Sequence, residues 1–376
     1  MTTPIAPESQ RHPPQTVLVL QGGGALGAYQ WGVYEGLHEA GIEPDWVIGT
    51  SIGAINAALI AGNLPHQRLE RMEAFWERVT HRGPSSWWAH LAPDWARSQQ
   101  KLEVVFGGLA GFFQPNWMSW GGDQRALGSE HAAFYSTQAL RHTLEGLLDT
   151  RLLAQGPTRL TVGAVNARTG QMRYFDNQRE ALGLDAVMAS GALAPAFGAV
   201  RIDGEPYWDG GLYSNSPIEV VLDDQPRRDA LIFSAHLWRA EGAEPQSLAA
   251  VHERLKDVQF ASRADSHIER QRQLHHLRHT IHELMDHLPA GKREHATLRE
   301  HAAYGCDSVV HVVKLHAARL PCDDVGKDGD FSPTTVKLRH QAGLATVRAA
   351  LSSQPWRRTR KLAEGLCVHE IEPVLS

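Results

Sequence analysis

Gly49-Thr50-Ser51-Ile52-Gly53 lies between a short apolar run and a stretch of small, apolar residues. The run Trp46-Val47-Ile48 predicts a strand, and residues 54–61 predict a buried helix. A Gly-x-Ser-x-Gly at such a junction is the nucleophile-elbow pattern, in which Gly49 and Gly53 permit a tight, strained turn. The turn would lift the Ser51 hydroxyl clear of the sheet, close to the positive end of the following helix. Ser51 is therefore a candidate nucleophile.

A second glycine cluster, residues 21–27, follows an apolar run at 16–20 that predicts another buried strand. Its glycines satisfy the dinucleotide fingerprint, which would place a pyrophosphate at the N-terminus of the next helix. That interpretation requires an acidic residue near the end of the next strand, but this chain has Ser51 there. The same backbone N–H groups can stabilise the oxyanion of a tetrahedral intermediate. We therefore interpret the cluster as an oxyanion hole.

A serine hydroxyl needs a neighbouring base to become a nucleophile. The chain has 21 histidines, so a Ser-His-Asp triad is not excluded by number, but few of them stand beside turn glycines at a strand end. Asp209 is a better candidate, because residues 202–208 predict a hairpin that presents it directly before Gly210 and Gly211. An Asp-Gly turn is also an ordinary feature of globular proteins. Asp209 alone would therefore not identify a site.

Taken together and in order, the motifs resemble those of the patatin-like phospholipases. They are Gly22-Gly23-Gly24-Ala25-Leu26-Gly27, Gly49-Thr50-Ser51-Ile52-Gly53 and Asp209-Gly210-Gly211. The small-residue block at 188–197 resembles the segment that precedes the last motif in that family, and Asn215 and Pro217 match the motif's end. The resemblance covers residues 16–235. It implies a bacterial patatin-like serine acyl hydrolase with an α/β fold, a three-layer α/β/α sheet that carries the nucleophile elbow.

The resemblance also implies the chemical roles of the residues. Ser51 would be the nucleophile and Asp209 its base, in a dyad without histidine. The backbone N–H groups of Gly23 and Gly24 would form the oxyanion hole, with Gly22 and Ala25 as further donors. Many members carry Arg or Lys where this chain has Leu26. The backbone donors survive this change, but a positive charge aimed at a phosphate is lost, which weakens the case for a phospholipid substrate.

Composition excludes several other classes of protein. A net charge of −5 and a pI near 6.5 provide no general attraction to nucleic acid. The three cysteines lie far apart, without the pairing of a disulfide framework or a zinc ribbon. No apolar run approaches the length of a membrane span. We therefore expect a soluble, cytoplasmic enzyme without cofactor, metal or nucleic-acid partner. The sequence does not indicate the oligomeric state.

The chain divides into three parts by composition, and the second contains an insertion. Residues 1–15 predict a flexible polar tail, and residues 16–235 the catalytic domain. Within it, residues 80–135 form an aromatic, cap-like insertion with five of the eleven tryptophans. The insertion could cover the acyl pocket, dip into a lipid surface or simply pack on the main domain. Its aromatic residues are Trp87, Trp88, Trp95, Phe106, Phe112, Phe113, Trp117 and Trp120.

Residues 236–376 predict a helix-rich C-terminal region. From 251 to 300, charges of both signs and histidines surround an apolar stripe at helical spacing, which is typical of a solvated helix. His282 and His287 are five residues apart, whereas a zincin helix requires four, so the pattern does not predict a metal site. Residues 309–315 predict one more strand, and Ser332 is expected to cap a helix that ends near residue 351. A basic run at 356–361 could touch anionic lipid.

The sequence thus predicts an enzyme that cleaves carboxylic esters of lipids, with a lipid or acyl ester as substrate and transient contact with a membrane surface. A short-chain carboxylesterase or thioesterase is the enzymatic alternative. A non-catalytic lipid-binding protein that keeps the fold is the second alternative. The presence of serine, base and oxyanion glycines argues against the latter.

Overall fold

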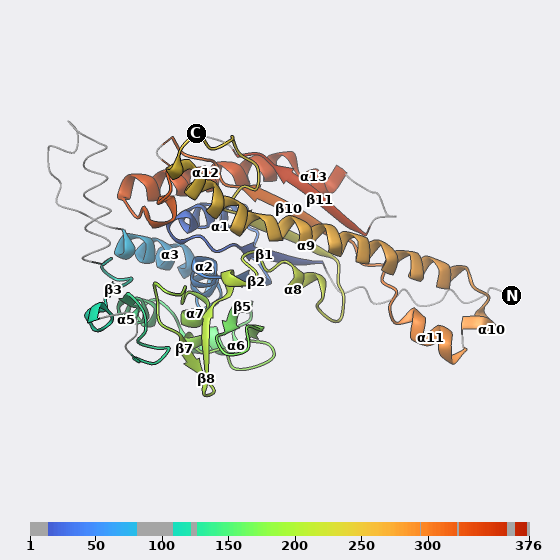
Figure 1. The fold of residues 1–376 in the computed structure, drawn as a ribbon. Coiled ribbons are helices and arrows are strands. Elements are labelled where there is room, and N and C mark those ends of the chain that lie inside the picture. The colour runs from blue at the N-terminus through green and yellow to red at the C-terminus, as the bar shows by residue number, and fades with distance from the viewer. Residues whose placement is uncertain are drawn as a thin grey trace.

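A mixed sheet forms the centre of the computed structural model, which describes residues 14–80, 108–121, 126–293, 295–321, 323–358 and 365–373 (Figure 1). The sheet has nine strands in the order β11-β10-β9-β1-β2-β5-β8-β7, with β6 paired to β5. The strands are β1 Gln15–Leu20, β2 Trp46–Gly49, β5 Arg159–Asn166, β6 Met172–Asp176, β7 Val200–Ile202, β8 Glu205–Asp209, β9 Ala230–His236, β10 Val310–His316 and β11 Leu366–Ile371.

Helices cover both faces of this sheet. The long ones are α1 Ala28–Glu39, α2 Ile52–Ala61, α3 Pro65–Val79, α9 Leu248–His287 and α12 Pro333–Ser353. The shorter helices are α5 Gln138–Glu145, α6 Thr150–Gln155, α7 Leu184–Ser190, α8 Glu219–Leu222, α10 Ala290–Arg293, α11 Ala296–Ala302 and α13 Pro355–Arg358. Single 3-10 turns are η1 Gly24–Gly27, η3 Trp117–Gly121, η4 Gly210–Leu212 and η5 Lys327–Gly329, and β3 Gln114–Pro115 pairs with β4 Tyr135–Ser136.

Successive side chains of β1 point to opposite faces, as strand geometry requires, and they enter two separate cores. Leu18 and Leu20 pack with residues of α1, α2, α3, α7 and α12 on one face. Val17 and Val19 pack with residues of α8 and α9 on the other. The three-layer α/β/α arrangement predicted from the sequence is therefore confirmed.

The C-terminal region belongs to the same sheet. β10 pairs with β9 in parallel, and β11 pairs with β10 in parallel, so two strands continue the sheet beyond residue 236. The strand predicted at 309–315 is β10, and the predicted helix is α12. Ser332 caps α12 as expected, because the Thr335 amide donates to Ser332 Oγ at 3.4 Å. The region is also rich in helix, as predicted. The division at residue 235 therefore follows composition and does not follow the edge of the sheet.

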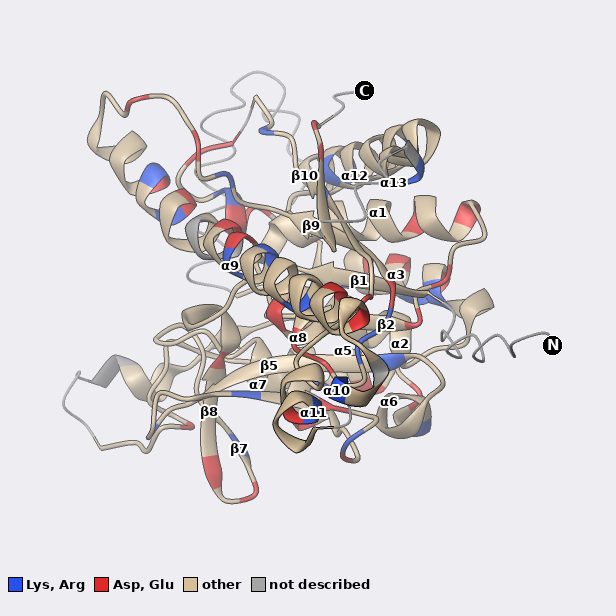
Figure 2. Cartoon of the chain, turned by 90° about the vertical axis from the view of Figure 1, so that its right-hand side faces the viewer, with Lys and Arg blue, Asp and Glu red and all other residues tan. Residues whose placement is uncertain are grey.

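The helix α9 is 40 residues long, and its far end carries α10 and α11 away from the sheet (Figure 1). Lys and Arg are interspersed with Asp and Glu along it (Figure 2), which agrees with the solvated helix expected from the sequence. Over the described ranges, no helix is both long and apolar enough to cross a bilayer. The same ranges contain no group of three or more His, Cys, Asp or Glu side chains that could hold a metal ion.

Three segments singled out in the sequence lie wholly or partly outside the described residues. The predicted polar tail is one of them, because the described chain begins at residue 14. Residues 81–107 and 122–125 of the aromatic insertion and residues 359–361 of the basic run are the others.

Candidate active site

Two strands end facing each other along one edge of β5. β2 runs parallel to β5 and stops with Gly49 opposite Val162, whereas β8 runs antiparallel and stops with Asp209 opposite Ala164. Both lie on the edge of β5 opposite to β6, since β6 pairs with the same β5 residues from the other side. The C-terminal ends of β2 and β8 are thus two β5 positions apart. This topology brings Asp209 to the turn that follows β2.

That turn is the nucleophile elbow predicted from the sequence. Ser51 has φ 57° and ψ −125°, a region that residues other than glycine seldom occupy. A Cβ on Gly53 would lie 2.1 Å from the Leu20 carbonyl oxygen, so α2 can approach β1 only with glycine at this position. The Ser51 amide donates to Ser190 Oγ at 3.1 Å, which steadies the strained backbone. The elbow therefore holds the Ser51 side chain at the end of the sheet.

Asp209 is almost fully buried, with 1 % of its surface exposed. Burial raises the pKa of its carboxyl group to about 7, against hydrogen bonds from the Ser51 hydroxyl and the Gly211 amide that lower the pKa. The Gly211 amide lies 2.7 Å from Asp209 Oδ1, and the Asp209 amide donates to the Ala192 carbonyl at 3.0 Å. The small-residue block at 188–197 thus supports both Ser51, through Ser190, and Asp209, through Ala192.

Gly22, the first glycine of the cluster at 21–27, forms hydrogen bonds through both its amide and its carbonyl. The Gly22 amide donates to the Asn215 carbonyl at 3.1 Å, so this candidate oxyanion donor already has an acceptor. The Gly22 carbonyl accepts from Trp238 Nε1 at 2.7 Å and from Asn215 Nδ2 at 3.1 Å. Gly23 and Gly24 open the turn η1, where the first amides of a helix lack an acceptor within it. These two amides remain the better oxyanion candidates.

A cavity of about 700 Å³ contains the motif residues. Gly22, Gly23, Gly24, Ser51 and Asp209 line it, whereas Ala25 does not. Of the described residues in its wall, none is a histidine. The motif residues thus bring a serine hydroxyl, a buried carboxyl group and a turn of backbone amides to this cavity.

Aromatic side chains form much of the remaining wall. Phe112 and Phe113, from the insertion, stand with Tyr135, Phe197 and Phe331 around the cavity. The ring centroids of Phe113 and Tyr135 are 4.8 Å apart, and those of Phe112 and Phe331 are 5.6 Å apart. The wall is therefore suited to an acyl chain, because burial of each methylene contributes about 0.8 kcal/mol. Trp117 is exposed, and Trp87, Trp88, Trp95 and Phe106 lie outside the described residues.

The C-terminal region contributes residues to the cavity that the sequence motifs did not indicate. They are Trp238, Lys256, Gln259, Phe260, Gly326, Asp328, Gly329 and Phe331. For Trp238 a signal existed, because it follows the carboxyl end of β9, and ligands of parallel sheets lie beyond that edge. For the others no local pattern was available, since they reach the cavity through long-range packing.

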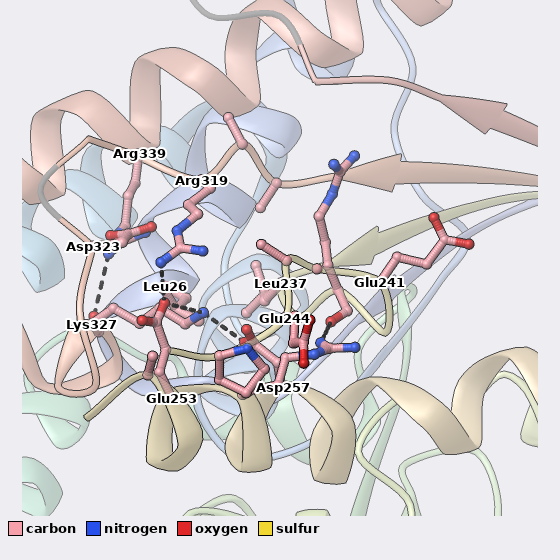
Figure 3. Close-up of a pocket in the computed structure, with 18 residues that line it drawn as sticks. Leu26, Leu237, Glu241, Glu244, Glu253, Asp257, Arg319, Asp323, Lys327 and Arg339 are labelled. Carbon is pink, nitrogen blue, oxygen red and sulfur yellow. Dashed lines mark hydrogen bonds and ion pairs between the residues drawn. The ribbon is translucent and has the colours of Figure 1, made fainter. Parts of the chain in front are cut away.

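Leu26 points away from the cavity that Ser51 and Asp209 line. It is 2 % exposed and faces a second, charged cavity behind the turn (Figure 3). An arginine at this position would therefore not point at a substrate in this backbone. The expectation that Leu26 removes a phosphate-binding charge is consequently not supported by the direction of this side chain.

His275, His279, Cys306 and Cys367 do not line the cavity that contains Ser51 and Asp209. His275 and His279 are buried between α9 and the sheet, where His279 Nε2 lies 2.8 Å from the Ser308 carbonyl oxygen. Cys306 and Cys367 are free and buried, and Cys322 lies outside the described residues.

Solved structures with similarity to this chain have low sequence identity. VipD from Legionella pneumophila is 16 % identical, with a TM-score of 0.37, over 91 % of this chain and 68 % of that one. ExoU from Pseudomonas aeruginosa, in complex with SpcU, is 18 % identical, with a TM-score of 0.29, over 69 % of this chain and 53 % of that one. Similarity at this level does not bear on function.

Sequence comparison is more specific. A segment of 44 residues is 61 % identical to lysophospholipase nte1 from Aspergillus terreus, which is 12 % of this chain and 3 % of that protein. A model described as patatin phospholipase matches residues 258–362. A model of the patatin-like phospholipase matches residues 18–222, more than half of the chain, and spans all three glycine-containing motifs. The chain therefore belongs to the patatin-like phospholipase family.

Proposed function

We propose that this protein is a serine acyl hydrolase that cleaves carboxylic esters of lipids through Ser51 and Asp209. The observation that carries the proposal is the meeting of β2 and β8 on β5, which brings Ser51 and the buried carboxyl group of Asp209 to the wall of one cavity. A base with a pKa near 7 suits proton transfer at neutral pH. Family membership supports the same activity.

In the proposed reaction, the Asp209 carboxylate takes the hydroxyl proton of Ser51 while Oγ attacks the ester carbonyl carbon. The amides of Gly23 and Gly24 hold the resulting oxyanion. When the intermediate collapses, the ester C–O bond breaks, and Asp209 returns the proton to the leaving alkoxide. Water then attacks the acyl-enzyme with Asp209 again as base, which releases the carboxylic acid and restores Ser51.

The substrate is proposed from the cavity wall. The aromatic side chains favour a long acyl chain. Among the described residues of the wall, Lys256 is the one Lys or Arg, and its ammonium already contacts both carboxylate oxygens of Asp328, at 2.8 and 3.0 Å. A substrate phosphate would have to compete with this carboxylate. We therefore expect a neutral glyceride or simple ester to be hydrolysed as readily as a phospholipid.

The test is covalent labelling together with hydrolysis. A fluorophosphonate probe should label the wild-type protein and fail to label Ser51→Ala. Asp209→Asn should lower kcat by a factor on the order of 10² or more, whereas His275→Gln, outside the cavity wall, should retain the wild-type rate. Labelling of Ser51→Ala, or full activity in Asp209→Asn, would contradict the proposed pair.

A series of p-nitrophenyl esters separates the alternatives. Catalytic efficiency should rise with acyl length until the aromatic cavity is full, and Phe113→Ala should reduce the rate for long chains more than for short ones. A maximum at acetate or butyrate would identify a short-chain esterase, and faster cleavage of matched thioesters a thioesterase. Lipid binding without any labelling or turnover would identify a non-catalytic lipid-binding protein.

An apolar stripe of exposed side chains supports transient contact with a lipid surface. It consists of residues of α9 that are 42 % to 72 % exposed: Leu248, Val251, Leu255 and Val258. Because the same helix contributes Lys256, Gln259 and Phe260 to the cavity wall, a lipid that meets the stripe is already beside the site. Replacing Leu248 and Leu255 with Ser should reduce sedimentation with phosphatidylcholine vesicles, and equal sedimentation would exclude this contact. A cytoplasmic location, which the few cysteines favour, stays a prediction.

A further inference from the structure

A second cavity, of about 370 Å³, lies behind the glycine turn and is lined by charged side chains (Figure 3). Leu26 and Leu237 form the part of its wall that belongs to the turn and to the end of β9. The charged residues come from the loop after β9, from α9, from the loop before α12 and from α12 itself, and they include Glu253, Asp257, Arg319, Asp323, Lys327 and Arg339. The reaction proposed above uses none of them.

Lys327 is the central cation of this group. It is 9 % exposed, and its ammonium lies 2.6 Å from Asp257 Oδ1. The same ammonium lies 5.4 Å from the centre of the Trp238 ring, within the range of a cation–π contact. A buried ion pair of this kind fixes geometry, because removal of one partner leaves an uncompensated charge away from water.

Lys327 belongs to a loop that is held at three places. At its start, Arg339 Nη2 lies 2.6 Å from Asp323 Oδ1, and it also donates to the Lys327 carbonyl at 3.3 Å. In its middle, Lys256 Nζ donates to the Val325 carbonyl at 3.1 Å and to the Asp328 carboxylate. The ion pair of Lys327 is the third attachment. The loop is therefore joined to α9 and α12 at once.

This loop packs directly on the glycine turn. Gly24 has φ +55°, and a Cβ there would lie only 2.2 Å from the Asp328 carbonyl oxygen. Trp238, whose ring contacts the Lys327 ammonium, donates its indole N–H to the Gly22 carbonyl. A Cβ on Gly23 would lie 3.2 Å from that indole nitrogen. Lys327 thus supports the turn in two ways. Its neighbour Asp328 packs against Gly24, and Trp238, which its ammonium contacts, packs against Gly22 and Gly23.

We propose that Lys327 is a positioning residue for the oxyanion turn. By pairing with Asp257 it keeps the loop and Trp238 against the turn, so that the Gly23 and Gly24 amides are directed at the oxyanion before the reaction begins. The C-terminal region would then complete the active site without touching the reacting atoms. This inference rests on the proposed function, in which these amides are the oxyanion donors.

The experiment compares an oxygen ester with the matched thionoester, whose carbonyl oxygen is replaced by sulfur. Sulfur is a weak hydrogen-bond acceptor, so the thionoester gains little from well-directed amides. Lys327→Gln should lower kcat for the oxygen ester about tenfold with little change in KM, and should lower the thionoester rate much less. Lys327→Arg, which keeps the charge, should recover most of the lost rate.

The matched control is Lys314→Gln. Lys314 is another buried lysine of the C-terminal region, 6 % exposed and paired with Asp265 and Glu370 at 2.7 and 2.8 Å, and these ion pairs involve neither the loop nor the turn. The variant should lose stability and keep the wild-type ratio of ester to thionoester rates. Asp257→Asn removes the nearer of two carboxylates, since Glu253 Oε1 also lies 3.7 Å from the Lys327 ammonium. It leaves Lys327 in place and is the variant to measure if Lys327→Gln does not fold.

Three results would overturn the inference. They are an unchanged kcat in Lys327→Gln, an equal loss for both esters, and the same change of ratio in Lys314→Gln. Failure of the proposed function would look different, since the wild-type protein would then hydrolyse neither ester or Ser51→Ala would remain active. In that case the proposed role of Lys327 would be rejected together with the proposed function.

Discussion

At the scale of single residues, two influences act in opposite directions on the pKa of Asp209. Its burial holds the pKa near 7, while the hydrogen bonds from Ser51 and Gly211 favour the ionised form. As a base it works only when ionised. We therefore expect kcat/KM to rise with pH and to level off above an inflection near pH 7, whereas Asp209→Asn should show a residual rate without this inflection. A rate that stays constant from about pH 5 to pH 8 would rule out Asp209 as the base.

The same pKa determines how Asp209 affects stability. The folded-state pKa of about 7 lies above the ordinary value of 3.8, so this group stabilises the fold fully below about pH 4, and the contribution is lost as the pH rises through 7. Each unit of pKa difference corresponds to about 1.4 kcal/mol. Asp209→Asn should therefore gain in Tm relative to the wild type as the pH is raised from about 4 to about 8. Parallel Tm curves for the two proteins would be inconsistent with the raised pKa.

At the scale of elements, the strand ends and the helices that follow them determine the site. Gly53→Ala would place a methyl group against the Leu20 carbonyl, and α2 would have to move away from β1. We expect a loss of about 1–3 kcal/mol in unfolding free energy and almost no hydrolysis. Gly183→Ala is a matched control, since a Cβ there meets no atom closer than 4.0 Å and φ is −90°. Similar Tm values for both variants would show that α2 accommodates the methyl group.

The elements also show what the sequence could predict. Apolar runs at 16–20 and 46–48, each followed by glycines, were sufficient for β1, β2 and the elbow, because their pattern is local. Asp209 was a candidate from the hairpin that precedes it, but its role came from the resemblance to a family, since an Asp-Gly turn has no distinctive local signal. The role of Lys327 could not have been found, because its position depends on packing between segments far apart in the chain. The direction of the Leu26 side chain could not be predicted either, since it depends on how η1 lies against the loop at 323–330.

At the scale of the whole molecule, the region after residue 235 is part of the central sheet and of the wall of the cavity that Ser51 and Asp209 line. β10 and β11 cover the edge of β9, and the loop at 323–330 lines the catalytic cavity. A chain that ends at His236 would expose the backbone of β9 and the apolar residues that pack against β10. We expect it to aggregate in size-exclusion chromatography and to resist fluorophosphonate labelling, in contrast to the full chain. A monomeric, labelled fragment would show that residues 16–235 suffice.

The meeting of β2 and β8 on one edge of β5 has a consequence for protein synthesis. Ser51 is made early, its base much later, and the loop that packs on Gly24 later still. A growing chain therefore carries Ser51 before it contains the groups that are proposed to activate this serine. Under the proposed function, hydrolytic activity should arise only after residues 323–330 have been made and have packed on the glycine turn. The order of the motifs along the chain thus separates the synthesis of Ser51 from that of its proposed base.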